Sequence, residues 1–134
     1  MAFKDADEVR KYIGGISKAG FDDPEIGAEM QATGIVVKFA FSEPDANLVI
    51  DMGRGEIGER AGMAAPGATM KMTADLGSAY WQGKVNLPLA MARGKIKVER
   101  NVASLMKLAP LGKQLFPEYL AALEADGRQD LLVA

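Results

Sequence analysis

Two neighbouring segments of the sequence alternate apolar side chains with other residues, and this period of two limits the fold more than any other feature. The apolar positions of the first segment are Ile35, Val37, Phe39 and Phe41, and those of the second are Leu48, Ile50 and Met52. Such a period predicts strands with one buried face. The turn residues 43–46 between the segments indicate that the two strands pair in an antiparallel hairpin.

Three further segments have strand character. A weak strand is predicted around residues 56–60, and clearer ones over 68–74 and 94–100. The positions that share a face in the segment 68–74 are Ala68, Met70, Met72 and Ala74. Because the first four strands follow one another along the chain, we expect them to form a meander.

Helical spacing precedes the strands. We expect a first helix from an N-cap at Asp5 or Asp7 to Lys18, with Gly20 as its stop. Asp23 and Pro24 then open a second helix over residues 24–31, which Gly34 can close.

Helices return after the strand at 68–74. Asp75 is predicted to cap a short helix that ends at Gly83, and Asn86 one over residues 87–93. Asn101 is predicted to cap a third helix, and Pro117 to open the last one. Helices, then strands, then helices with a late strand indicate an α+β fold rather than a wound parallel sheet. The length of 134 residues fits one domain, 1–134.

The chain contains no His and no Cys. This composition excludes a Ser-His-Asp triad, a Cys nucleophile, disulfides and a zinc site with the usual nitrogen and sulfur ligands. The carboxylates that remain as acid and base candidates are Asp51, Glu56, Glu59 and Asp75. Each lies at a turn, on a polar strand face or at a cap, and no spacing joins two of them in one site. We therefore expect no enzyme, no cofactor and no metal site.

Residues 53–58 match the pattern G-x-G-x-x-G and follow a predicted strand. A dinucleotide site needs those glycines to open a helix, and no apolar stripe of helical spacing follows them. A hairpin turn is the better interpretation, because glycine supplies the positive φ angles that tight turns require.

Basic residues concentrate in one stretch, where Glu99 is the single acidic residue. The cations of this stretch are Lys84, Arg93, Lys95, Lys97, Arg100, Lys107 and Lys113. They fit an anionic head group, an acyl-CoA phosphate or an acidic partner, with a solvated basic face as the simpler alternative. Nucleic acid is disfavoured, because the whole chain is slightly acidic and its aromatic residues do not interleave with the cations. Residues 1–8 turn acidic where a secretory signal would be apolar, so we expect a cytoplasmic protein.

Methionine is frequent at the predicted interior positions, namely Met30, Met52, Met63, Met70, Met72, Met91 and Met106. Its flexible thioether suits a cavity that fits variable guests, although an ordinary core remains the alternative. The last two predicted helices also carry more apolar surface than docking on a sheet requires. A lid over a pocket would use that surface.

These residues resemble the sterol carrier protein 2 (SCP-2) family of lipid carriers. The resemblance covers roughly residues 34–123 and rests on the order of elements, the strand 48–51 before a glycine turn, and Gly83-Lys84 leading through Ala90-Met91 to residues 94–98. It implies a five-stranded, largely antiparallel sheet, covered on one face by helices and enclosing an apolar tunnel. It also implies fatty acids, acyl-CoA or sterol-like lipids as ligands. One departure is Arg100, which stands where the family usually has a glycine after the last strand.

We expect the ligand to contact apolar side chains from the sheet and the helices. The predicted lining residues are Phe39, Phe41, Ile50, Met52, Met70, Met72, Tyr80, Trp81, Met91, Met106, Leu115 and Phe116. The weaker candidates for an anionic head group are Lys84, Lys95 and Lys97. A transient contact with a membrane or an enzyme stays open. The alternative function is an accessory subunit whose apolar C-terminal segment docks on a larger metabolic enzyme.

Overall fold

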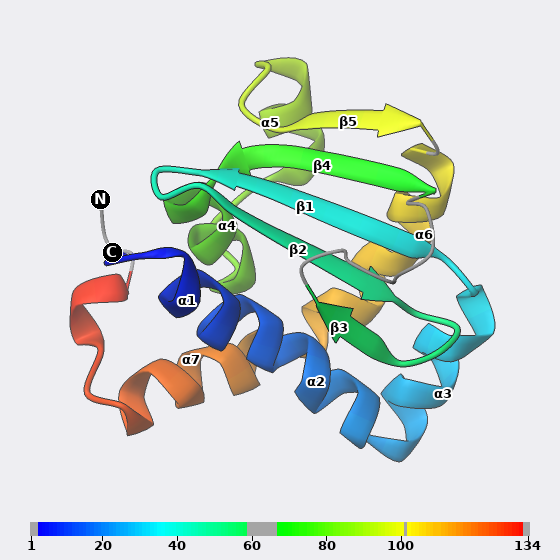
Figure 1. Ribbon diagram of the computed structural model, residues 1–134, viewed down its shortest axis with the longest axis horizontal. Helices are drawn as coiled ribbons and strands as arrows, with labels where there is room; N and C mark the ends of the chain where they lie inside the picture. Colours follow the sequence, from blue (N-terminus) through cyan, green and yellow to red (C-terminus); the bar gives the residue numbers. More distant parts are fainter. Residues whose placement is uncertain (1–2, 59–66, 101, 133–134) are drawn as a thin grey trace.

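The computed structural model describes residues 3–58, 67–100 and 102–132. Its centre is a five-stranded sheet with the order β3-β2-β1-β4-β5 (Figure 1). The strands are β1 (Val36–Ser42), β2 (Ala46–Asp51), β3 (Glu56–Gly58), β4 (Ala68–Thr73) and β5 (Lys97–Arg100). Four predictions fall partly or wholly outside the described residues: Glu59, Met63, the cap Asn101 and the end of the strand at 56–60.

The register of the strands brings apolar side chains into rows. Phe39 of β1 pairs with Leu48 of antiparallel β2 and with Met70 of parallel β4. Met70 in turn pairs with Val98 of antiparallel β5. Since neighbours in a row share a face of the sheet, these strands present one continuous apolar surface.

The predicted meander is wrong. β4 does not continue from β3 but pairs in parallel with β1, so β1 lies in the middle of the sheet. β3 has three residues, all of them exposed or half-buried, and forms an edge. The longest strand, β1, instead takes the central place, where both of its edges are hydrogen-bonded. The sheet is therefore mixed but mostly antiparallel, as expected.

The alternation predicted for β2 holds for only one face. Leu48 and Ile50 are buried, but so are Val49 and Asp51 on the opposite face. The buried Asp51 carboxylate accepts the backbone N–H of Arg54 at 3.2 Å. It thereby stabilises the turn before β3, in which Gly55 has a φ of 67°. The pattern at 53–58 is thus a hairpin turn that leads into β3.

The N-terminal helical segment consists of α1 (Ala6–Val9), the π-helix η1 (Arg10–Gly14) and α2 (Gly15–Asp22). Asp5 caps it, because its carboxylate accepts the N–H of Glu8 at 3.0 Å. The predicted stop at Gly20 is wrong. Gly20 is buried against α3 (Pro24–Thr33), and a Cβ there would lie 2.9 Å from the Met30 sulfur. This glycine allows close helix packing and does not end the helix.

The second helix is predicted correctly. The Asp23 carboxylate accepts the N–H groups of Glu25 and Ile26, which satisfies two free donors at the start of α3. Gly34 follows α3 in the left-handed region with a φ of 63°, and β1 starts two residues later.

The later helices are α4 (Ala74–Trp81), α5 (Leu87–Ala92), α6 (Val102–Lys113) and α7 (Phe116–Ala125), followed by the short 3-10 helix η2 (Gln129–Leu131). They follow the predicted order with one corrected cap. The hydroxyl of Thr73, rather than Asp75, accepts the N–H of Leu76 at 3.1 Å, and Asp75 lies in the first turn. None of the described helices is long and apolar enough to span a membrane.

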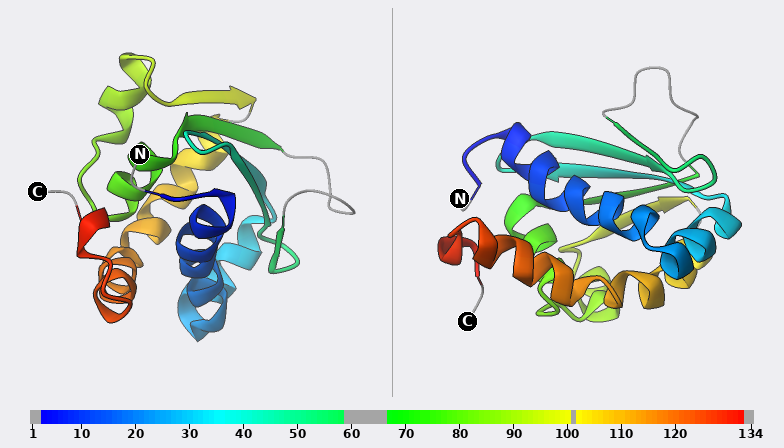
Figure 2. Two further views of the ribbon diagram at one scale, coloured as in Figure 1. Left: turned by 60° about the vertical axis from the view of Figure 1, so that its left-hand side comes forward. Right: turned by 90° about the horizontal axis from the view of Figure 1, so that it is seen from below.

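Helices from both ends of the chain cover the same face of the sheet (Figure 2). The N-terminal segment and α7 run side by side in both views, with α4 and α6 also beneath the strands. The side chains of Leu48, Ile13 and Leu123 are almost fully buried in the resulting core. A layer of helices on one face of a sheet is an α+β arrangement, which confirms the predicted fold class.

Candidate functional site

An apolar cavity of about 70 Å³ lies between the sheet and the helices. The strands and the residue after β2 contribute Val37, Phe39, Phe41, Ile50, Met52, Met70 and Met72. The register explains this cluster, because Phe41 pairs with Met72 in the same way as Phe39 pairs with Met70. The central strands thus supply a continuous apolar wall.

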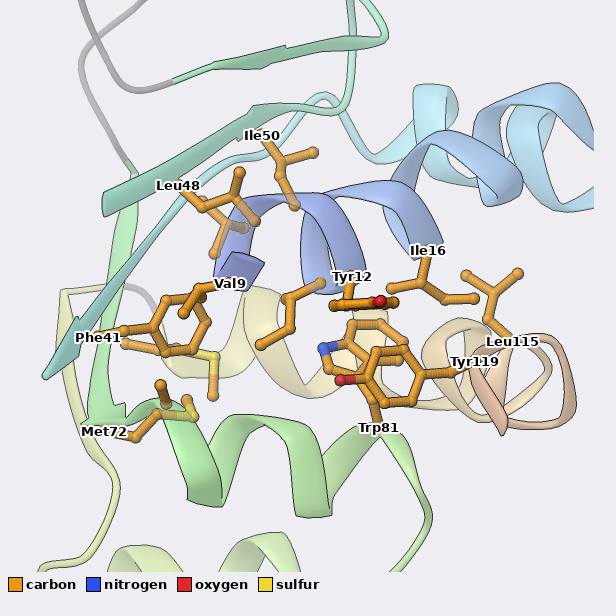
Figure 3. Packing of buried hydrophobic residues seen from close by; sticks show 14 of the residues in the cluster. Val9, Tyr12, Ile16, Phe41, Leu48, Ile50, Met72, Trp81, Leu115 and Tyr119 are labelled. Atoms are coloured by element: carbon orange, nitrogen blue, oxygen red, sulfur yellow. The ribbon is translucent and has the colours of Figure 1, made fainter. Parts of the chain in front are cut away.

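The helices supply the opposite walls. Their contributions are Ser17, Met30, Gly77, Tyr80, Trp81, Leu87, Leu105, Leu108, Ala109, Leu111 and Gly112, with Leu115 from the turn before α7. In Figure 3, Phe41 and Met72 from the sheet and Trp81 from α4 point toward the same interior space. Gly77 lets α4 approach the sheet, since a Cβ at this position would lie 2.7 Å from a ring carbon of Phe41.

The chemistry of the lining is almost entirely hydrocarbon, thioether and aromatic. The lining residues with polar side-chain atoms are Ser17, Tyr80 and Trp81, and none of the described lining residues is charged. Burial raises the pKa of the Tyr80 hydroxyl above its usual value, so this group stays neutral at physiological pH. Within the described residues, no cluster of carboxylates could hold a metal ion. The cavity therefore suits an apolar guest.

A buried polar network lies beside the cavity. The hydroxyls of Ser78 and Tyr119 are 2.8 Å apart, and the Gln82 amide donates to Ser78 Oγ at 3.0 Å and to the Leu131 carbonyl at 2.8 Å. Burial raises the pKa of Tyr119 to about 12, although its hydrogen bond to Ser78 opposes the shift. None of these four residues lines the cavity. Because the network joins α4 to α7 and the C-terminal turn, its role is structural.

Solved structures show the same fold. The solution structure of sterol carrier protein domain 2 from Helicoverpa armigera matches with a TM-score of 0.67 and 26% identity, over 81% of this chain and 88% of that one. Sterol carrier protein 2 from Aedes aegypti in complex with palmitate matches with a TM-score of 0.56 and 27% identity, over 80% and 93%. Sterol carrier protein 2 from Yarrowia lipolytica, in its apo form, matches with a TM-score of 0.59 and 16% identity, over 78% and 87%. No family model and no curated protein matches the sequence.

This chain has an SCP-2-like fold. The resemblance noted in the sequence is thereby confirmed at the level of the fold. Arg100, at the position where the resemblance leads us to expect a glycine, has a φ of 71°. The turn after β5 is therefore left-handed in this chain although the residue there carries a Cβ.

Most of the predicted lining residues lie on the cavity wall of this SCP-2 fold. They are Phe39, Phe41, Ile50, Met52, Met70, Met72, Tyr80, Trp81 and Leu115. Met91, Met106 and Phe116 do not line the cavity and pack half-buried against the core. Phe116 lies behind the wall, with its ring 5.6 Å from that of Tyr80 and 6.0 Å from that of Trp81.

The predicted lining set contains none of the residues that α6 supplies to the cavity wall. The helix contributes Leu105, Leu108, Ala109 and Gly112, together with Leu111. The first four follow the spacing i, i+3, i+4, i+7 that defines one helix face. Helical periodicity could therefore have found them. Met106 is predicted as a lining residue because of its residue type and not because of its position on the helix. It lies on another side of α6 from the four lining residues.

The three candidate lysines do not line the cavity of the SCP-2 fold. Lys97 pairs with Lys71, one position away from the row that joins Val98 and Met70. Lys97 is therefore on the opposite face of the sheet from the cavity. Lys84 and Lys95 are exposed in the turns after α4 and α5.

Proposed function

We propose that this chain binds an apolar lipid in its internal cavity and carries it without catalysis. The observation that supports this function most is the lining of the cavity. It brings together four methionines and twelve aliphatic or aromatic side chains, and none of the described lining residues is charged. The four methionines are Met30, Met52, Met70 and Met72. The palmitate complex of the Aedes aegypti protein supports a fatty acyl chain as the ligand class. Acyl-CoA and sterol-like molecules are the other candidates.

The driving force for such binding is the removal of hydrocarbon from water. Each methylene group that enters the cavity contributes about 0.8 kcal/mol. Polar contacts then have only to orient the ligand. The uncharged polar groups on the wall are the hydroxyls of Ser17 and Tyr80 and the indole N–H of Trp81.

The cavity must expand to hold a long chain. An apolar cavity of about 150 Å³ accommodates benzene in another protein, whereas this cavity measures about 70 Å³. Met70 and Met72 have flexible side chains that can move aside. In α6, Pro110 leaves the Met106 carbonyl without the amide donor of a regular helix, which weakens the wall near Ala109.

Native mass spectrometry of the purified protein, followed by organic extraction, tests whether a lipid is bound. Displacement of a fluorescent fatty acid then measures affinity. The variant Ala109→Trp places a large side chain in the cavity, and Ala103→Trp adds the same side chain at an exposed position of the same helix. If the tryptophan displaces two methylenes of the ligand, binding to Ala109→Trp weakens roughly tenfold. Ala103→Trp should bind as the unaltered protein does.

Equal affinities of the two folded variants would contradict binding in this cavity. Failure of the unaltered protein to bind any fatty acid, acyl-CoA or sterol would contradict the carrier function itself. The accessory-subunit alternative would then be favoured.

A further inference from the structure

Helix α5 exposes an apolar surface at the edge of the molecule. Its six residues, Leu-Pro-Leu-Ala-Met-Ala, include no polar side chain. Leu87 and Ala90 face inward and are buried, whereas Pro88, Leu89 and Ala92 are exposed. Leu89 is 46% exposed, which is the largest value among the exposed large hydrophobic residues of the described chain. An outward helix face normally carries polar residues, so this face needs a separate explanation.

Cations flank this apolar helix on both sides along the chain. They are Lys84 before α5 and Arg93, Lys95 and Lys97 after it, and all four side chains are exposed. No Asp or Glu occurs between Asp75 and Glu99. All the charged side chains of the segment 76–98 are therefore positive.

The place of α5 in the fold makes this surface accessible. The helix lies at the periphery beside the edge strand β5, away from the chain termini (Figure 1). The N–H of Lys95 donates to the Ala90 carbonyl at 2.9 Å, and the N–H of Gly94 to the Met91 carbonyl at 3.1 Å. These bonds fix the turn that carries Arg93 and Lys95 against the end of the helix.

The same helix forms part of the cavity wall. Leu87 lines the cavity, and Leu89, two residues further along the helix, points outward. A single short helix therefore separates the interior space from the surroundings at this point.

We propose that α5 and three of its flanking cations, Lys84, Arg93 and Lys95, form a docking surface for an anionic lipid bilayer. Leu89 and its apolar neighbours enter the boundary between head groups and acyl chains, and the cations contact the anionic head groups. An exposed apolar helix that cations flank along the chain fits this layered environment better than it fits an acidic protein, which would leave Leu89 without an apolar partner. Docking in this orientation places the α5 wall of the cavity directly on the bilayer.

Vesicle co-sedimentation of the full chain tests the proposal. The two probes are vesicles of phosphatidylcholine alone and vesicles of phosphatidylcholine mixed with phosphatidylserine. We expect binding to the mixed vesicles that decreases with added salt, and much weaker binding to phosphatidylcholine alone. Leu89→Gln should weaken binding to the mixed vesicles roughly tenfold, and Arg93→Gln/Lys95→Gln should weaken it by roughly tenfold or more.

Matched control variants distinguish vesicle binding through the α5 surface from nonspecific binding of the protein to the vesicles. Val102→Gln alters the other exposed large hydrophobic residue, and Lys107→Gln/Lys113→Gln removes the same charge from α6. Both controls should bind the mixed vesicles as the unaltered protein does. Equal losses in the controls and the α5 variants would overturn the proposal. Absence of binding by the unaltered protein would also overturn it, and an acidic protein would then be the better partner for the cations.

Vesicle binding does not require an occupied cavity. A failure of this test is therefore distinguishable from a failure of the proposed lipid-carrier function. Thermal unfolding of each variant checks that the changes at these exposed positions leave the fold intact.

Discussion

At the scale of single residues, Arg100 shows a conflict between side chain and backbone. It ends β5 with a φ of 71°, in the left-handed region that costs a residue with a Cβ roughly 1–2 kcal/mol. Glycine adopts this region without that cost. This chain therefore holds a residue with a Cβ in a conformation that glycine adopts more easily.

Two substitutions of Arg100 separate the free-energy cost of the left-handed backbone from the contribution of the side chain to stability. Arg100→Ala removes the side chain but keeps the strained Cβ, whereas Arg100→Gly removes both. We expect the glycine variant to be more stable than the alanine variant by about 1 kcal/mol in urea unfolding. Equal stabilities would show that the turn relaxes to another conformation.

At the scale of secondary-structure elements, one glycine in α2 and one in α3 have opposite roles. Gly27 lies in the first turns of α3, and a Cβ there would be 2.5 Å from the backbone oxygen of Phe21. Gly15 begins α2, and a Cβ there would meet nothing within 4 Å. The first glycine is required for packing, and the second only reduces helix propensity.

The same substitution should therefore change stability in opposite directions at these two sites. Gly15→Ala should raise the free energy of unfolding by up to about 1 kcal/mol, because alanine favours the helix. Gly27→Ala should lower it by about 2 kcal/mol, because the backbone of Phe21 cannot move aside easily. Chemical unfolding of both variants measures the difference. A stabilising effect of Gly27→Ala would mean that the α2–α3 corner adjusts freely.

At the scale of the whole molecule, an ion pair joins the two ends of the chain. Arg128 Nη1 lies 2.9 Å from Glu8 Oε2, and the other Glu8 oxygen accepts the backbone N–H of Lys4 at 2.9 Å. The bond from Lys4 and the bond from Arg128 lower the pKa of Glu8 below its ordinary value. Arg128 also lowers the pKa of Asp130. The C-terminal turn is thus attached to the N-terminal helix.

This ion pair predicts an acid-sensitive contribution to stability. A carboxylate with a lowered pKa in the folded state stabilises the protein above its unfolded pKa, about 4.3 for Glu, and the effect is lost as pH falls through the folded pKa. Glu8→Gln should lower the free energy of unfolding near pH 7 by at most about 1 kcal/mol and should flatten its decline below about pH 4.5. Unfolding midpoints across this range test the effect. Glu29→Gln, at an exposed position of α3, should leave the acid slope unchanged.

Local sequence features predicted most of the secondary structure. The caps Asp23 and Asn86 are predicted correctly, and of the two candidates Asp5 and Asp7 the structure selects Asp5, because capping depends on groups only two or three residues apart. The alternation of β1 and β4 likewise located the sheet side of the cavity. Gly20 failed as a stop because its role depends on Met30 and Leu115, which other elements bring against it.

An α+β chain with an apolar, methionine-rich interior and a basic segment around residues 84–97 can be predicted from the amino-acid sequence. Spacing and caps involve residues that are close together in the chain, and composition is given by the sequence itself. All three can therefore be interpreted before the tertiary structure is known. The tertiary structure alone decided that β4 pairs in parallel with β1, that Lys97 points away from the cavity, and that Leu87 and Leu89 lie on opposite sides of α5. These outcomes depend on which surfaces bury one another across distant parts of the chain, and no local pattern specifies that choice.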